Sequence, residues 1–279
     1  MKEDLTPKNI EKPDFGDSAE FPIMPLRNTV LFPQQVIPIY IGREKSLHLI
    51  GDLDKGTKKY IVVVAQEDGS IEDPGKEDLY AYGTLAHVLK VFEMPDNSKS
   101  AIVQGISRVK ILDYTKDEPY YEAAVTQLEE IELSEDLELD ALSNNLRQSF
   151  ADLIKIAPNL TDEHTGMLSN IQKPNRLADR AISLMTLSNS EKQEILEELD
   201  VKARVEKSIK IISREIQRIK LGEEIQTEVH DEIAKTQREY YLREQMKAIK
   251  KELGEDEGTV ELKELEDKIK AANMPDDAE

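Results

Sequence analysis

Tyr60-Ile-Val-Val-Val-Ala65 is the stretch that decides the fold class of this 279-residue chain. Its six residues form a continuous apolar run rich in β-branched side chains. Such a run is typical of a strand buried on both faces. We therefore expect the segments on either side of it to supply the other strands of a sheet.

Two strand patterns and one helix pattern precede this run. Phe21-Pro-Ile-Met-Pro-Leu-Arg-Asn-Thr-Val-Leu-Phe-Pro33 is apolar but contains three prolines. Because proline cannot donate to a central ladder, this stretch predicts an edge strand followed by a wide loop. Val36–Ile41 predicts a short strand, and Arg43–Asp54 predicts a helix that Gly56 would close.

Three more strand patterns follow the run, at Tyr82–Met94, Ala101–Tyr114 and Tyr120–Leu128. Pro95-Asp-Asn-Ser98 predicts a hairpin loop between the first two. Five or six strands and one helix therefore predict a small, mostly antiparallel β-barrel or curled sheet over residues 20–132. Residues 1–19 are polar and predict a disordered tail.

Helical periodicity replaces the strand patterns over residues 133–200. Four helices are predicted: Leu137–Ile156, Thr161–Ile171, Leu177–Met185 and a last one ending near Leu199. Asn175 is the expected N-cap of the third helix. Ser190 with Gln193 forms a capping-box pattern for the fourth. The segment is expected to form a compact helical bundle.

A long coiled-coil-like helix is predicted over residues 201–254, with Asp200 as its N-cap. Val205, Ile209, Ile212, Ile216 and Ile219 recur at spacings of four and three, and a shifted set follows at Ile225, Val229 and Ile233. A continuous helix of this length would span about 80 Å. We expect part of it to project and to find a partner, with a bend near Gly222. Residues 255–279 predict a helical linker.

Charge is high and uneven. Lys plus Arg number 37 and Asp plus Glu 57, so the formal net charge is −20. Nucleic-acid binding is therefore disfavoured, although residues 201–220 form a basic block. An acidic block at 223–232 and a basic block at 235–251 could set the register of the long helix against a second copy; an ordinary solvated surface is the alternative.

The sequence shows no catalytic or cofactor site of its own. It contains no Cys, which excludes disulfides, thiolate metal sites and a cysteine nucleophile. Gly51–Lys58 only approaches a phosphate-binding loop, and it is better explained as the end of a helix. His48, His87, His164 and His230 are widely separated, so no metal site is predicted. The start of the chain is charged and predicts no secretory signal.

Two groups of apolar side chains are candidate contacts for an unfolded polypeptide. Val30, Leu31 and Phe32 lie in a proline-bounded loop, and Tyr240, Tyr241 and Met246 lie on the long helix. Apolar side chains on a loop or a projecting helix can bind unfolded polypeptide, and methionine adapts to varied partners. The alternatives are that the loop residues fill the core and that Tyr240 packs in a helical seam.

Two of these stretches, taken together, resemble the N-terminal region of the Lon protease family. Phe21–Pro33 resembles the opening of its β-rich module, and Gln237-Arg-Glu-Tyr-Tyr-Leu-Arg-Glu-Gln-Met-Lys-Ala-Ile-Lys-Lys-Glu-Leu-Gly254 resembles the helix before its ATPase module. The resemblance covers residues 20–279 and implies an α+β fold: a PUA-like β-barrel, a helical bundle and a long projecting helix.

The resemblance also implies a function. Lon is a cytoplasmic, homo-hexameric, ATP-dependent serine protease of the AAA+ class that degrades misfolded and short-lived regulatory proteins. Its N-terminal region recognises substrates and helps to organise the hexamer. ATP, Mg²⁺ and the Ser–Lys pair belong to family domains with no matching positions here, so this chain is expected to be inactive alone and to hold no cofactor. The alternative is an oligomerisation scaffold that binds no substrate.

Overall fold

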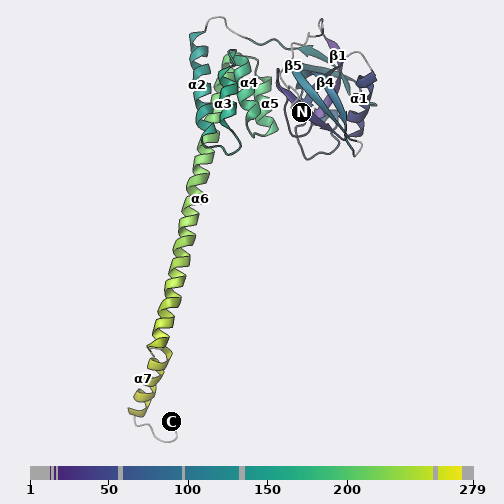
Figure 1. Ribbon diagram of the computed structural model, residues 1–279. Coiled ribbons are helices and arrows are strands. Elements are labelled where there is room, and N and C mark those ends of the chain that lie inside the picture. Colours follow the sequence, from purple (N-terminus) through teal and green to yellow (C-terminus); the bar gives the residue numbers. More distant parts are fainter. Residues whose placement is uncertain are drawn as a thin grey trace. The chain divides into compact units, whose positions relative to one another are not determined.

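The computed structural model describes residues 13, 16, 18–55, 59–95, 98–131, 136–253 and 257–271. The chain divides into two units, residues 1–217 and 218–279, which are described separately. Figure 1 labels the helices and the strands β1, β4 and β5. Most of the predicted tail lies outside the described residues. The predicted helix ends at Gly56 and Gly254 and the centre of the hairpin loop, Asp96 and Asn97, also lie outside them.

The first unit opens with a six-stranded sheet. Its strands are β1 (Ala19–Leu26), β2 (Val36–Ile41), β3 (Tyr60–Ala65), β4 (Tyr82–Glu93), β5 (Lys99–Lys116) and β6 (Glu122–Gln127), with α1 (Glu44–Lys55) between β2 and β3. The strand order is β2-β5-β4-β3-β1-β6, and β5 also pairs with β6. Among these six strands only β1 and β3 pair in parallel. Strands β5, β4, β3, β1 and β6 pair in succession and β6 returns to β5. Among the described strands β2 pairs with β5 alone, so the six strands are curled but do not form one closed barrel.

The prediction that Phe21–Pro33 supplies an edge strand is wrong. In β1, Ala19–Pro22 pair with β6 and Ile23–Leu26 pair with β3. The strand therefore changes partners at Ile23, and each half has a ladder on one side. Such an arrangement accommodates Pro22 and Pro25, because a missing N–H is tolerated on the side without a ladder.

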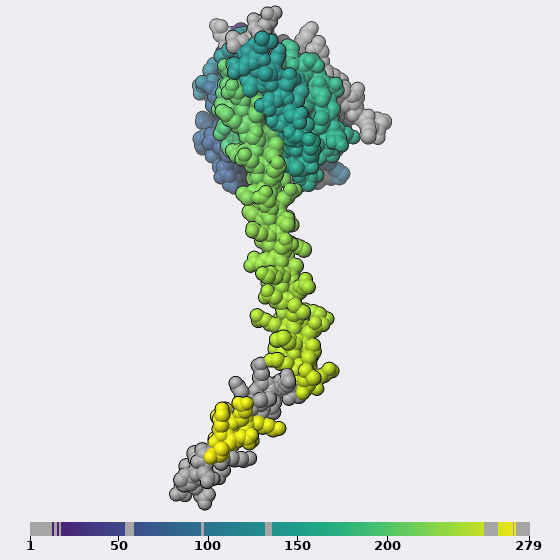
Figure 2. Space-filling model, turned by 90° about the vertical axis from the view of Figure 1, so that its left-hand side faces the viewer, coloured from purple at the N-terminus to yellow at the C-terminus, as the bar shows by residue number. Residues whose placement is uncertain are grey.

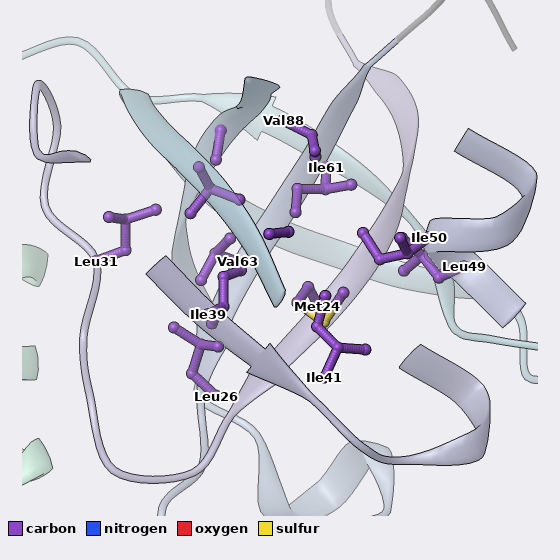
Figure 3. Close-up of a cluster of buried hydrophobic side chains, with 13 residues drawn as sticks. Met24, Leu26, Leu31, Ile39, Ile41, Leu49, Ile50, Ile61, Val63 and Val88 are labelled. Carbon is purple, nitrogen blue, oxygen red and sulfur yellow. The ribbon is translucent and has the colours of Figure 1, made fainter. Parts of the chain in front are cut away.

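Both faces of β3 are buried, as its sequence predicts. Ile61 and Val63 belong to one hydrophobic cluster, which includes Met24, Ile39 and Ile50 (Figure 3). Val62 and Val64 belong to a second cluster with side chains from β4, β5 and β6. Because side chains alternate along a strand, one apolar run can serve two cores.

The loop after β1 is part of the core. Val30, Leu31 and Phe32 are at most 3% exposed. The Thr84 hydroxyl donates to the Leu31 carbonyl oxygen at 2.5 Å. Gly105 lies under the loop so closely that a Cβ there would be 2.3 Å from the Phe32 carbonyl oxygen. The loop is thus fixed by main-chain contacts as well as by apolar packing.

The helical part of the first unit comprises α2 (Leu137–Ile154), α3 (Asp162–Ser169), α4 (Pro174–Leu184), α5 (Asn189–Glu197) and the start of α6 (Val201–Glu252). The Asp200 carboxylate accepts from the Ala203 N–H, which confirms its predicted capping role. These helices pack together and also against the sheet. Gln193 Nε2 in α5 donates to the Tyr82 carbonyl oxygen at 3.0 Å, and Asn189 Nδ2 donates to the Arg27 carbonyl oxygen.

Two predicted caps are wrong. The N-cap of α4 is Lys173, followed by Pro174, whose fixed φ suits the first helical position. The capping box of α5 is formed by Ser188 with Glu191 rather than by Ser190 with Gln193. A serine followed three positions later by Glu or Gln occurs twice here, once from Ser188 and once from Ser190. The earlier pair caps the helix.

The helix α6 is continuous through Gly222 and crosses from the first unit into the second. Val205 and Ile212 are fully buried, whereas every residue from 221 to 249 is exposed. The unit boundary therefore falls after Gln217 and not at Asp200, because the first turns of α6 complete the bundle. The second unit also contains α7 (Glu257–Ala271), within the predicted helical linker.

Candidate functional site

The first unit contains a groove with a volume of about 920 Å³ in its β-rich part. One wall is the C-terminal half of β1 with its loop, Met24–Thr29. The opposite wall is the end of β2 and the start of α1, Ile39–Ser46, and His48 and the segments around Asp73 and Glu118 complete the lining. The groove therefore lies between the C-terminal half of β1 with its loop and the end of β2.

Buried side chains hold the two walls in place. Met24 and Leu26 from β1 pack in one cluster with Ile39 and Ile41 from β2, and Figure 3 shows the four side chains beside one another. Each is at most 6% exposed, so they belong to the base of the groove and not to its rim. Tyr40, between the two isoleucines, is 67% exposed. Alternation along β2 thus places an aromatic side chain at the open side of the groove.

Four carboxylates and three Lys or Arg side chains line the groove: Glu44, Glu72, Asp73, Glu118, Arg27, Arg43 and Lys45. The cations are engaged within the protein. Arg43 donates to Gln66 Oε1 at 2.6 Å, Lys45 pairs with Glu118 at 3.1 Å, and Arg27 donates to the Gly69 carbonyl oxygen. Burial, with a contribution from nearby Arg27, lowers the pKa of Arg43.

The carboxylates of Glu72 and Asp73 are exposed at this rim, and no hydrogen bond or ion pair from the described part of the chain reaches them. Their Coulombic interaction with Arg43 acts to raise its pKa, against the effect of burial. The groove therefore combines an apolar base, one exposed aromatic side chain and a rim on which four carboxylates outnumber three Lys or Arg side chains. Such a surface suits an apolar segment carrying positive charge.

An ion cluster elsewhere in the first unit joins the sheet to the helices. Arg108 of β5 donates to Glu130 Oε1 at 2.7 Å and to Asp179 Oδ1 at 2.6 Å. Arg204 of α6 donates to the same Glu130 oxygen at 2.6 Å. Asn175, predicted as a helix cap, instead donates to Glu130 Oε2. Burial acts to raise the pKa of Glu130, but the two guanidinium groups outweigh it and hold this pKa below 4.5.

The structure separates the two groups of predicted contact residues. Val30, Leu31 and Phe32 are buried, which supports the alternative that they fill the core. Tyr240, Tyr241 and Met246 belong to the second unit and are 68%, 63% and 58% exposed. The sequence therefore identified apolar side chains that face solvent on α6, but it did not identify the groove.

Side chains project from the helix along the distal part of α6 (Figure 2), and the apolar ones form two stripes. The first stripe consists of Leu221, Ile225, Val229 and Ile233, and the second stripe consists of Leu242, Met246, Ile249 and Leu253. Each side chain is at least half exposed. At 100° per residue the stripes lie on faces about a third of a turn apart. The exposed apolar side chains of α6 therefore do not form one continuous seam. The sequence predicted a seam that shifts its position after Ile219.

Three other kinds of site concern phosphate, metal ions and membranes. Gly51–Lys55 belong to α1, and Gly56, Thr57 and Lys58 of the near-miss phosphate loop lie outside the described residues. Within the described ranges, no three His, Asp or Glu side chains are grouped so that they could hold a metal ion. None of the described helices is long and apolar enough to cross a membrane.

The comparison with protein families decides the relationship. Residues 20–214 match the model of the ATP-dependent protease La (LON) substrate-binding domain. This chain belongs to the Lon family. The groove lies inside the matched residues, and the exposed stripes of α6 lie beyond them.

Relatives agree with this assignment. The chain is 43% identical to a Lon protease of Koribacter versatilis over 266 residues, which are 95% of this chain and 32% of that protein. It is 39% identical to a Lon protease of Dictyoglomus thermophilum over 92% of this chain and 32% of that one. The chain thus spans about a third of the length of these Lon relatives.

A solved structure shows the same fold. The N-terminal domain of a Mycobacterium avium complex Lon protease superposes with a TM-score of 0.56 at 21% sequence identity. The match covers 70% of this chain and 98% of that domain. The α+β fold class and the Lon N-terminal architecture implied by the sequence are therefore confirmed.

Proposed function

We propose that this chain recognises unfolded or misfolded polypeptides for an ATP-dependent Lon protease, and that the groove between β1 and β2 is where it does so. The observation that carries the proposal is the position of the groove within residues 20–214, the segment that matches the Lon substrate-binding domain. Its apolar base and acidic rim suit a segment exposed only when a protein is unfolded.

The proposal can be tested by measuring how tightly labelled, unfolded casein binds to variants of three exposed tyrosines. Tyr40 lines the groove, whereas Tyr240 and Tyr241 lie on α6. Tyr40→Ser is expected to weaken binding several-fold, because it removes the aromatic surface at the open side of the groove. Matched Tyr240→Ser and Tyr241→Ser variants show whether α6 adds a second contact surface, together with Met246.

Each result has a defined meaning. Loss of binding only in the α6 variants would move recognition away from the groove. Absence of casein binding by the unaltered chain would remove the recognition role altogether. We also infer that ATP, Mg²⁺ and Ser–Lys chemistry reside in other parts of a cytoplasmic Lon polypeptide, so casein cleavage by this chain with ATP would contradict that inference.

Self-association is the second candidate function, and the two exposed stripes of α6 favour it. Two copies paired antiparallel bring the first stripe of one onto the second stripe of the other. The facing residues would be Leu221 with Leu253, Ile225 with Ile249, Val229 with Met246 and Ile233 with Leu242. The acidic block 223–232 then lies along the basic residues Arg243, Lys247, Lys250 and Lys251. Parallel pairing in register would place acid against acid.

Light scattering tests this association with substitutions that leave the first unit intact. Ile212 is fully buried in the bundle, so a charge there would unfold the unit. Ile225 and Val229 are 52% and 50% exposed. Ile225→Glu with Val229→Glu is expected to abolish concentration-dependent association. If the unaltered chain and the variant both have the molar mass of a single chain, α6 does not mediate association, and a hexamer-organising role for it is contradicted.

A further inference from the structure

A second cavity, with a volume of about 490 Å³, lies in the first unit where the sheet meets the helical bundle. Its walls are Pro33 and Gln34 after β1, the stretch Ile106–Arg108 of β5, the stretch Gln127–Glu130 at the end of β6 and beyond it, and the start of α4 from Lys173 on. This junction cavity has a volume in the range of sites for small organic molecules, far larger than a single inorganic ion requires.

Two cations line the junction cavity at the start of α4. Lys173 is the N-cap residue of this helix and Arg176 lies in its first turn, and both residues are exposed. In the part of the chain that the structure describes, the side chain of neither residue takes part in a hydrogen bond or an ion pair. Both charges are therefore free to bind a ligand.

Most carboxylates of the junction cavity are engaged within the protein. Glu130 accepts from the guanidinium groups of Arg108 and Arg204. Asp179 accepts from Arg108 at 2.6 Å. Glu129 is exposed and is the remaining acidic side chain of the lining. Among the described residues, two unpaired cations and one unpaired carboxylate therefore line the cavity, so it attracts an anion although the whole chain carries −20.

The lining also contains a hydroxyl without a partner. Ser107 of β5 lines the junction cavity and is only 7% exposed, and its Oγ makes no hydrogen bond within the described ranges. Buried hydroxyls almost always have a partner, so this one points to a missing ligand atom. The first turn of α4 has no acidic side chain to compensate the positive end of the helix dipole. An anionic oxygen would satisfy both.

We propose that the junction cavity binds the C-terminal carboxylate of an unfolded polypeptide. A carboxylate can accept from both Lys173 and Arg176, and it is the anion that a polypeptide carries at its end. The volume leaves room beside it for the last residues of the chain. The inference rests on the proposed function and adds a second contact to it: the groove would bind internal segments, and the junction cavity would bind the chain end.

Three labelled peptides test this assignment by fluorescence anisotropy with the 279-residue chain. The first is a short, valine-rich peptide with a free C-terminal carboxylate and the label at its N-terminus. The second is the same peptide with a C-terminal amide. The third is the amide with one internal threonine replaced by glutamate, so that its net charge equals that of the first. We expect the free acid to bind about tenfold more tightly than either amide.

Substitution of the two cations locates the bound carboxylate. In Lys173→Gln with Arg176→Gln, the free acid is expected to bind only as tightly as its amide, and both amides are expected to bind as they do to the unaltered chain. Lys155→Gln with Lys210→Gln is the matched control, because these two lysines are exposed, lie outside the cavity lining and give the same change in net charge. The control should keep the preference for the free acid.

Equal affinities of the free acid and its amide would overturn the inference and leave the proposed function standing. Equal affinities of the free acid and the glutamate peptide would also overturn it, because any added negative charge would then suffice. A preference for the free acid that survives in Lys173→Gln with Arg176→Gln would place the carboxylate elsewhere and overturn it as well. Failure of all three peptides and of unfolded casein to bind would overturn the proposed function itself.

Discussion

Gly105 shows how a single position on β5 fixes the loop beside the groove. The Gly105 N–H donates to the Gln35 carbonyl oxygen, and its own carbonyl oxygen accepts from Gln34. Gln34 has a positive φ of 63°, an uncommon conformation for a residue with a side chain. The buried loop and β5 therefore approach through main-chain atoms, and no side chain fits between them.

Gly105→Ala is expected to lower the free energy of unfolding of the first unit by at least about 1–3 kcal/mol, because the new Cβ would overlap the Phe32 carbonyl oxygen. Urea denaturation measures the change. Gly51→Ala is the matched control within the same unit. Gly51 lies in α1 with nothing within 4 Å of a new Cβ, so alanine there should add up to about 1 kcal/mol. Equal effects at the two glycines would contradict the described packing.

Glu130 makes the stability of the first unit depend on pH. Its pKa in the folded chain is held below 4.5 by Arg108 and Arg204, against the opposing effect of burial. A carboxyl with a lowered folded pKa stabilises the fold above its unfolded pKa, and the benefit is lost as the pH falls through the folded value. We expect the urea midpoint to fall as the pH is lowered through and below the ordinary glutamate pKa of 4.5.

Glu130→Gln is expected to lower the free energy of unfolding by about 1.5–3 kcal/mol at neutral pH and to reduce this pH dependence. Lys155 pairs with Asp152 on the surface of α2, so Asp152→Asn is a control that should change either quantity little. A pH dependence that is as steep in Glu130→Gln as in the unaltered chain would assign the effect to other carboxyls.

At the scale of elements, sequence patterns predicted well where strands and helices occur, but they did not predict which strands pair with one another. The β-branched run at Tyr60–Ala65 and the long periodicity after Asp200 correspond to β3 and α6. The prolines of β1 suggested an edge strand, because a sequence does not show that a strand can change partners halfway. The groove depends on the same pairing, so it could not be located from the residues alone.

Helix caps and the buried ion cluster were missed for a related reason. Asn175 and Gln193 looked like local capping residues, but their amides donate to Glu130 and Tyr82, which are far away in the chain. The exposed residues of α6 were easier to predict. Tyr240, Tyr241 and Met246 lie where a helix longer than its bundle leaves side chains uncovered.

Cysteine crosslinking can test the antiparallel pairing of α6, since the chain has no native cysteine. Mixed Ile225→Cys and Ile249→Cys chains are expected to form a disulfide between unlike copies, because these positions face each other. Neither variant alone should crosslink efficiently. Non-reducing electrophoresis of chains carrying different tags measures the products.

Thr227→Cys mixed with Ala248→Cys is the matched control, because these positions lie at similar heights on faces turned away from the stripes. Little crosslinking is expected. Efficient crosslinking of Ile225→Cys with itself would indicate parallel helices and contradict the antiparallel register.

At the scale of the whole molecule, the two candidate functions reside in different units. The groove belongs to residues 1–217, and both stripes belong to residues 218–279. Ile212 is the last fully buried side chain of α6, and every residue from 221 to 249 is exposed. The exposed part of α6 therefore contributes little to the stability of the first unit.

A chain ending after Lys220 is expected to keep the thermal transition and the peptide affinity of the first unit and to lose self-association. Differential scanning calorimetry, anisotropy and light scattering measure the three properties. Loss of peptide binding in the shortened chain, with its thermal transition unchanged, would instead place recognition on α6.

The continuity of α6 has a mechanical consequence. Arg204, which holds Glu130 next to the sheet, lies one turn from the start of the same helix that carries both stripes. A pull on the distal half of that helix is therefore transmitted through its hydrogen-bonded backbone to the ionic joint between sheet and bundle. Tension applied by a neighbouring molecule or motor would load this joint directly, and the joint would govern how much force the first unit withstands before it opens.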